Sequence, residues 1–346
     1  MAGRFDSPLV FSAKAAGAGG PTRAVRQRIQ FIAFSFIMAS AGAFGRPFLE
    51  ALIMKLASSL AIAAALASSP VAPGAAFAAG SLKAAWVSGH GTNAAGCGSL
   101  TNPCATFQYV HDNIVAAGGL IAVLDSSSYG PLVIRNAISI VDDGGLAGIA
   151  VASGDAIDIQ AGPTDAVFLK GLHVDGLGTA SNGIKLTSAG SLTVANCTVR
   201  GFGLVNGVGS GNGIFITPAS SPVSFNIFDT IISGNVAFGI FVFAGNSNAV
   251  GNVKHVTAIN NGNVNSGVGG GLVAQGSAAN VIVSDSNFSQ NHLTGIWADG
   301  GQVSVSNSVA TLNDGYDLDN LSGTLTSYQN NIYSVSYGVI SPASLH

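Results

Sequence analysis

Apolar and polar residues alternate along most of the chain after residue 79. The segments "GIKL", "SLTV", "VIVS" and "VSVS" place an apolar side chain at every second position, which is the period of a half-buried β-strand. Only one stretch, residues 105–119, has a modest helical pattern of apolar positions. The sequence therefore predicts an almost entirely β structure with one short helix.

The alternating segments form a repeat. Each copy opens with a glycine followed by an apolar residue, and successive glycines are 30, 26, 32, 24 and 20 residues apart. Gly, Asn, Ser and Asp fill the corners between the strands, where positive φ or hydrogen bonds from side chain to backbone are needed. Repeats of this length are typical of solenoids, and three short strands per repeat predict a parallel β-helix. The leading glycines are Gly183, Gly213, Gly239, Gly271, Gly295 and Gly315.

Equivalent residues of neighbouring coils should stack about 4.8 Å apart, which is the spacing of strands in a sheet. A polar column of this kind is predicted at the corner between the second and third strands, with Val256 interrupting it. We interpret these side chains as corner residues that bind their own backbone, and not as catalytic acids. Its members are Asn196, Asp229, Asp285, Asn307 and Gln329.

The repeat "NGIKLTSAGSLTVANCTVRGF" at residues 182–202 resembles the repeats of right-handed parallel β-helix proteins, the superfamily of pectate lyases and polygalacturonases. The segment that begins "WVSGHGTNAAGCGSLTNPCATFQYV" at Trp86 resembles the cap and first coil of secreted bacterial members. This resemblance implies an all-β solenoid of about seven coils, with a cap at residues 79–118 and the β-helix at 119–346. It does not imply an activity, because the fold carries lyases, hydrolases and adhesins.

The N-terminal region predicts export. Residues 54–78 combine one Lys, a short apolar run and a small-x-small end, "AFA", before Ala79. This is the pattern of a secretory signal peptide starting at Met54, so we expect a secreted, periplasmic or cell-surface protein without a membrane span. Residues 1–53 are either a genuine extension or upstream sequence translated from a start codon assigned too early. An uncleaved membrane anchor is the third alternative.

The cysteines and the charge fit an exported protein. Cys97 and Cys104 lie in a Gly-, Asn- and Pro-rich loop, and in an oxidising compartment we expect them to form a disulfide. Cys197 interrupts an alternating strand and is expected to be a small buried residue. From residue 79 onward there are 6 Lys and Arg against 14 Asp, a formal charge of −8. An acidic domain argues against nucleic acid as a partner.

The first strand of each repeat has an outward row of side chains in which aromatic residues predominate. Exposed aromatic residues in a row suit the apolar faces of sugar rings, and a contiguous exposed apolar patch marks a binding surface. The row predicts binding of an extracellular or cell-surface glycan. The alternative is that these rings pack under loops or under the N-terminal segment. The candidate glycan-binding residues are Lys185, Phe215, Phe241, Phe243, Trp297 and Asp299.

An acidic patch, Asp299, Asp317 and Asp319, is predicted to end this row and supplies weak candidates for catalysis. A polysaccharide lyase would need calcium and a basic proton acceptor, and a glycoside hydrolase needs two suitably spaced carboxylates. No basic residue except the terminal His346 follows His292. We therefore expect binding without catalysis, no cofactor and no metal site. A lyase or hydrolase, with calcium for a lyase, is the alternative, and a structural surface or adhesion protein is a further one.

Overall fold

The computed structural model describes residues 80–203, 210–245, 247–263 and 267–344. Within them, nearly every strand joins one of three long parallel sheets, of eleven, nine and six strands. A two-stranded piece extends the six-stranded sheet through single bridges at Asn287. The predicted extension at 1–53 and signal peptide at 54–78 lie outside the described residues. Within the described part, no helix is long and apolar enough to cross a membrane.

The eleven-stranded sheet contains β1 (Leu82–Val87), β2 (Val115–Val123), β5 (Ile138–Val141), β8 (Ala166–Lys170), β11 (Ser191–Ala195), β14 (Val223–Phe228), β17 (Ala249–Lys254), β20 (Ala279–Ser284), β22 (Gln302–Ser306), β25 (Thr324–Tyr328) and β28 (Ile340–Ala343). The nine-stranded sheet contains β4 (Leu132–Ile134), β7 (Asp155–Gln160), β10 (Asn182–Ser188), β13 (Asn212–Ile216), β16 (Phe238–Phe243), β19 (Gly270–Gln275), β21 (Thr294–Asp299), β24 (Tyr316–Asn320) and β27 (Ser336–Tyr337). The six-stranded sheet contains β3 (Ser127–Ser128), β6 (Ala147–Ala150), β9 (Leu172–Asp175), β12 (Thr198–Arg200), β15 (Ile231–Ser233) and β18 (Thr257–Ile259). The two-stranded piece pairs β23 (Val309–Ala310) with β26 (Ile332–Tyr333).

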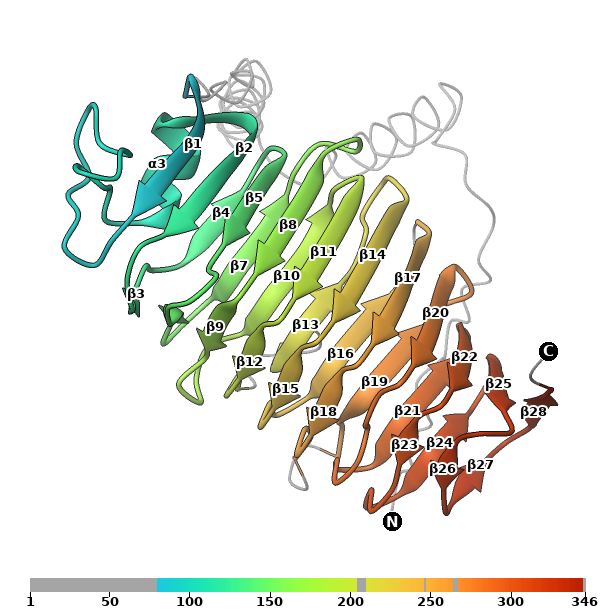
Figure 1. The fold of residues 1–346 in the computed structure, drawn as a ribbon. Helices are drawn as coiled ribbons and strands as arrows, with labels where there is room; N and C mark the ends of the chain where they lie inside the picture. Colours follow the sequence, from blue (N-terminus) through green and yellow to red (C-terminus); the bar gives the residue numbers. More distant parts are fainter. Residues whose placement is uncertain (1–79, 204–209, 246, 264–266, 345–346) are drawn as a thin grey trace, which may run out of the picture. The chain divides into compact units, whose positions relative to one another are not determined.

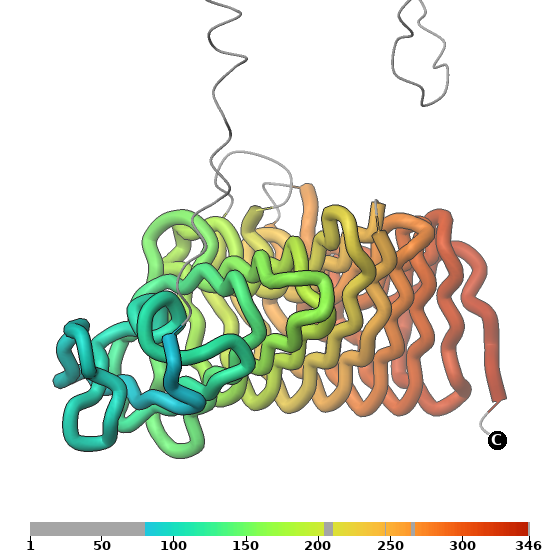
Figure 2. The backbone as a smooth tube through the Cα atoms, turned by 90° about the horizontal axis from the view of Figure 1, so that it is seen from above, coloured from blue at the N-terminus to red at the C-terminus, as the bar shows by residue number. Residues whose placement is uncertain are grey.

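Successive strands of the chain enter the three sheets in turn, so the predicted right-handed parallel β-helix is confirmed. β10, β11 and β12, for example, belong to the nine-, eleven- and six-stranded sheets. The colours of Figure 1 therefore advance steadily along each sheet, and the tube in Figure 2 shows the coils stacked in sequence order. Because every strand pairs in register with the coil before and after it, residues far apart in sequence share one column.

The core of the β-helix is built from such columns of aliphatic residues. Each burial of a Leu, Ile or Val side chain stabilises the fold by roughly 1.5–3 kcal/mol. Cys197 is buried in this core as expected, and burial raises the pKa of its thiol to about 11, which leaves it protonated and unreactive. One inner column of the nine-stranded sheet contains Ile157, Ile184, Ile214, Ile240, Leu272, Ile296 and Leu318.

The corner between the second and third strands is a single residue with positive φ in five successive coils. His255, with φ 53°, takes this place in the coil where the sequence suggested an interruption at Val256, and Val256 is buried. The sequence prediction was therefore wrong by one residue at this coil, and positive φ does not continue to Gln329. The observed column contains Asn196, Asp229, His255, Asp285 and Asn307.

A buried asparagine ladder supports the turn that leads back into the nine-stranded sheet. In Asn261, Nδ2 donates to Oδ1 of Asn291 at 3.1 Å, and Oδ1 accepts from Nδ2 of Asn235 at 2.9 Å. Each amide also accepts the backbone N–H of the preceding member. A polar ladder this deep is stable only because every buried polar group has a partner. The ladder contains Asn235, Asn261, Asn291 and Asn313.

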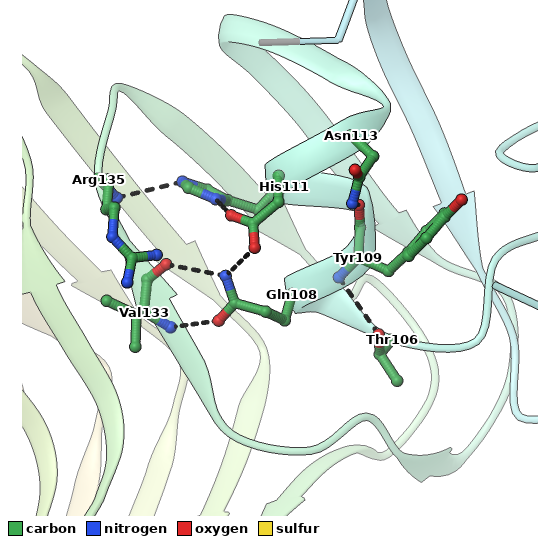
Figure 3. A network of polar contacts seen from close by, with 8 residues as sticks. Thr106, Gln108, Tyr109, His111, Asn113, Val133 and Arg135 are labelled. Atoms are coloured by element: carbon green, nitrogen blue, oxygen red, sulfur yellow. Dashed lines mark hydrogen bonds and ion pairs between the residues drawn. The ribbon is translucent and has the colours of Figure 1, made fainter. Parts of the chain in front are cut away.

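The one helix in the described residues, α3 (Phe107–Asn113), covers the end of the nine-stranded sheet. Thr106 caps it by accepting the N–H of Tyr109. The Gln108 amide accepts the N–H of Val133 at 2.7 Å and donates to its carbonyl oxygen at 3.3 Å, so an edge strand obtains hydrogen-bond partners. His111 accepts the N–H of Arg135 at 3.2 Å (Figure 3). The helix thereby protects an edge that would otherwise pair with other chains.

The Cys97–Cys104 disulfide is formed, with the two Cα atoms 5.1 Å apart. It closes the loop that precedes α3, within the region predicted as the cap. β1, which lies within the region predicted as the cap, pairs with β2, which begins at Val115. Strands of the eleven-stranded sheet therefore already occur before residue 119.

Candidate functional site

The outer face of the nine-stranded sheet carries one continuous column of side chains, which we call the outer column. Pairwise registers connect it from β7 to β27, and the labels of these strands run diagonally across Figure 1. The column explains why the aromatic residues predicted from separate repeats come together. In order, its members are Asp158, Lys185, Phe215, Phe241, Val273, Trp297, Asp319 and Tyr337.

Aromatic rings cluster in the middle of the outer column. Phe215 and Phe241 stack with their ring centroids 5.0 Å apart, and Phe243 lies 6.1 Å from Phe241. Phe241 is only 7 % exposed and Val273 only 1 %, although both lie outside the β-helix core. Phe243 is 36 % exposed, and Phe215 and Trp297 are half-buried. The rings thus form a second hydrophobic cluster with an accessible rim. They are less exposed than the row of aromatic residues that the sequence predicts.

Phe238 belongs to this cluster and was missed by the sequence analysis. It occupies the first position of β16, next to the corner glycine, so the alternation of the strand gave no sign that its ring faces outward. Its ring centroid is 5.3 Å from that of Phe241 and 6.2 Å from that of Trp297. The ring reaches Trp297 across Gly270, where an added Cβ would lie 3.5 Å from Phe238 and 2.6 Å from Thr294 Oγ1. A side chain at Gly270 would therefore clash with Thr294, while its distance to Phe238 would be an ordinary contact.

Two carboxylates lie at the acidic end of the outer face: Asp319 in the outer column, and Asp299 two residues after Trp297 on β21. Oδ2 of Asp299 accepts from the Gln275 amide at 2.5 Å, and Oδ1 accepts from the Ser322 hydroxyl at 3.3 Å. Asp319 is only 8 % exposed. Burial, with a contribution from the negative charge of Asp299, raises the pKa of Asp319 to about 6. Asp299 is therefore held by hydrogen bonds, whereas Asp319 is a carboxyl group in an unfavourable environment.

Asp317 does not lie on the outer face, and its prediction as a third member of the acidic patch is wrong. β24 pairs with β21 so that Asp317 falls opposite Gly295, one of the leading glycines of the repeats. Its carboxylate is buried and accepts from Asn313 Nδ2 at 2.8 Å and from the backbone N–H groups of Ser334 and Val335 at 2.7 and 3.0 Å. Asp317 terminates the asparagine ladder and has a structural role.

The other end of the outer column is polar and largely self-paired. Lys185 Nζ lies 3.0 Å from Asp155 Oδ2, while Asn182 donates to the second oxygen of Asp155 at 2.8 Å. Asp158 accepts from the Gln160 amide at 2.6 Å. Lys185 is thus on the predicted face, but its charge is already matched by a neighbouring carboxylate.

Unmet hydrogen-bonding capacity is concentrated on this sheet. Within the described residues, four buried side-chain atoms have no hydrogen-bond partner, and all four belong to strands of the nine-stranded sheet. Three of them lie on β21 and β24, beside the aromatic cluster. Buried polar groups in folded proteins are nearly always paired, so each exception requires an explanation. The atoms are Asp158 Oδ1, Thr294 Oγ1, Trp297 Nε1 and Asp319 Oδ1.

Hollows lie along the positive-φ corner between the eleven- and six-stranded sheets. One of them, of about 380 Å³, is lined by the turns that follow β5, β8, β11 and β14. Its charged groups are already paired, as in the contact between Lys170 and Asp143 at 2.5 Å. Farther along this corner, His255 Nδ1 lies 3.4 Å from Asp229 and Nε2 lies 3.8 Å from Asp285. Because several of their charged groups pair with one another, these hollows give weaker support for a ligand than the outer column.

The described residues contain no group of three or more His, Cys, Asp or Glu side chains arranged to hold a metal ion. Comparisons with protein-family models, curated proteins and solved structures give no match to this chain. The outer column is therefore the candidate site, because its aromatic rings can stack on a ligand and lie next to buried polar atoms that lack partners.

Proposed function

We propose that this protein is exported and binds an extracellular or cell-surface glycan on the outer face of its nine-stranded sheet, without catalysis. The observation that carries the proposal is the cluster of five aromatic rings outside a complete β-helix core: Phe215, Phe238, Phe241, Phe243 and Trp297. A β-helix does not need a second hydrophobic cluster on its outer face for stability, whereas sugar rings bind by stacking on such rings.

The shape of the face supports a linear ligand. Equivalent side chains on neighbouring strands are about 4.8 Å apart, so the outer column presents a regular row across successive coils. The half-buried rings of Phe215 and Trp297 lie on either side of the buried Phe241 and Val273. A chain of sugar units following the helix axis would contact several coils at once.

The test is a binding screen of neutral and acidic polysaccharides, followed by calorimetry on the best ligand. Trp297→Ala and Phe243→Ala should each weaken binding about tenfold or more, since each removes a ring at the accessible rim. The matched control is Ile282→Ala, because Ile282 is an exposed apolar residue (50 %) on β20 of the eleven-stranded sheet. Equal affinity for the wild type and both aromatic variants would refute the proposed surface.

A glycoside hydrolase is the second candidate, favoured by the raised pKa of Asp319 next to Asp299. A carboxylic acid with a pKa near neutrality is suited to protonate a leaving group, while Asp299 would supply the second carboxylate. The test is incubation with the polysaccharide that binds best and an assay for new reducing ends. Release that is lost in both Asp319→Asn and Asp299→Asn would establish hydrolysis, and silence across the panel supports binding alone.

A further inference from the structure

Trp297 and Asp319 are cross-strand neighbours in the outer column, with one unpaired atom each. The register places Trp297 of β21 opposite Asp319 of β24. Trp297 Nε1 is a donor without an acceptor, and Asp319 Oδ1 has no donor within the described residues. Leaving a buried donor or acceptor unpaired lowers stability, so the fold keeps these two atoms on cross-strand neighbours at a cost that a ligand able to pair with both would relieve.

The chemistry of the two atoms restricts that group. An indole N–H only donates, and an ionised carboxylate only accepts. An ammonium group could donate to Asp319 but would have no lone pair for Trp297. A ligand carboxylate could accept from Trp297 but would have no proton for Asp319, and Asp299 and Asp319 would repel it. A hydroxyl group accepts and donates at once, so among these ligand groups it alone has the chemistry to pair with both atoms.

We propose that Trp297 and Asp319 form a subsite for a hydroxyl group of a neutral glycan, which accepts from the indole N–H and donates to the carboxylate. This inference rests on the proposed function and specifies its substrate class: neutral sugar chains in preference to polyuronates and amino sugars. Thr294 on the same strand also keeps its hydroxyl oxygen buried without a hydrogen-bond partner.

The position of the subsite fits this role. Gln275 and Ser322 donate hydrogen bonds to the Asp299 carboxylate. Asp319, in contrast, keeps a buried oxygen atom without a hydrogen-bond partner. The next residue of the outer column is the exposed Tyr337 on β27, the last strand of the sheet. The subsite therefore lies between the aromatic cluster and the edge of the sheet, and a sugar stacked on the Trp297 ring would bring its hydroxyl groups to the rim of that ring.

The test is calorimetry with neutral and uronate oligosaccharides of matched length, using Trp297→Phe and Asp319→Asn. Trp297→Phe keeps an aromatic ring but removes the N–H, and should weaken neutral binding about tenfold. Asp319→Asn removes the charge but keeps an acceptor, so it should weaken neutral binding severalfold and strengthen uronate binding. The control Asp143→Asn alters an exposed carboxylate at the corner after β5 and should leave both affinities unchanged.

The outcomes separate the two proposals. Wild-type binding that is lost in Trp297→Ala but intact in both Trp297→Phe and Asp319→Asn would leave the glycan function standing and overturn the subsite. A wild-type preference for uronates would likewise overturn the subsite and leave the glycan function standing. Absence of binding to any glycan in the panel would overturn the proposed function and the subsite together.

Discussion

Trp297 and Asp319 face each other across β21 and β24, and each keeps a polar atom buried without a hydrogen-bond partner. The fold could have avoided this arrangement, because it satisfies its other buried ladders fully, as at Asn261. Unpaired groups and perturbed carboxyl groups are typical of functional sites, where stability is sacrificed for binding. The relationship between these two residues therefore connects the energetics of the fold with its proposed function.

Asp319→Asn should stabilise the protein at pH 7.5 by about 1 kcal/mol, after allowance for screening by solvent. Burial raises the pKa of Asp319 in the folded protein to about 6, above its ordinary value of 3.8. When the pKa of an acid is raised by folding, its contribution to stability is complete below pH 3.8 and is lost as the pH rises through 6. Urea unfolding should therefore show a larger difference between variant and wild type at pH 7.5 than at pH 4. A constant difference at both values would contradict the assigned environment.

Glycan affinity should fall when the pH is lowered from 7.5 to 5. Protonation of Asp319 removes the charge that strengthens its hydrogen bond with a ligand hydroxyl. The neighbouring groups in the site are Asp299 and Tyr337, with Trp297 and Gln275 uncharged. The pKa of Asp319 is raised into this range. Calorimetry across this range should show a severalfold loss for the wild type and a flat profile for Asp319→Asn. A flat wild-type profile would speak against a role for the carboxylate.

Asn261→Ala should destabilise the fold by about 3 kcal/mol or more. The change removes the acceptor of the Asn235 amide and backbone N–H, and it removes the Nδ2 donor to Asn291 and Ile232. Unpaired groups in a buried network carry large penalties. Asn252→Ala is the matched control, because Asn252 also bonds an asparagine of the neighbouring coil but is exposed. Denaturant unfolding should place the control within about 0.5 kcal/mol of the wild type. Similar losses in both variants would contradict the special role of the buried ladder.

Gly239→Ala should destabilise the fold, while Gly144→Ala should be nearly neutral. A Cβ at Gly239 would lie 2.7 Å from the Gly271 carbonyl oxygen and 3.0 Å from Asn261 Nδ2. The same addition at Gly144 meets nothing within 4 Å. The expected loss at Gly239 is on the order of 2 kcal/mol or more, the range for forced overpacking, and thermal unfolding of the two variants measures it. Equal melting temperatures would show that the coils are looser than this packing implies.

Much of the architecture could be predicted from local patterns. The alternation around Ile184 and the recurring glycines determined both the strands and their stacking, because a sheet of in-register coils converts sequence spacing into columns. The outward row was correct for Lys185, Phe215, Phe241 and Trp297 in the same way. Whether that row binds a glycan remains a prediction.

The errors arose where register depends on contacts between coils. Gly315 resembles the leading glycine of another repeat, but the β21–β24 pairing gives that place to Asp317, because its carboxylate completes the asparagine ladder. The same hydrogen bonds remove Asp317 from the outer face. The corner column passes through His255 because that residue adopts the positive φ of its neighbours Asp229 and Asp285. Neither preference is visible in the local sequence.

The degree of burial of side chains on the outer face also could not be predicted from the sequence. Alternation indicates which side of the sheet a ring occupies, but not whether a neighbour covers it. Phe238 packs on Phe241 and, across Gly270, on Trp297, and this diagonal contact between strands is set by the register alone. The two unpaired atoms likewise appear only when Trp297 and Asp319 are brought opposite each other.

The most direct test of the outer column uses the fluorescence of Trp297. The chain has two tryptophans, so Trp86→Phe leaves Trp297 as the sole reporter. Titration of this variant with the best neutral oligosaccharide should change the tryptophan emission saturably, with the same Kd as calorimetry. Calorimetric binding without any change in the emission of Trp297 would place the ligand elsewhere and contradict the assignment of this face.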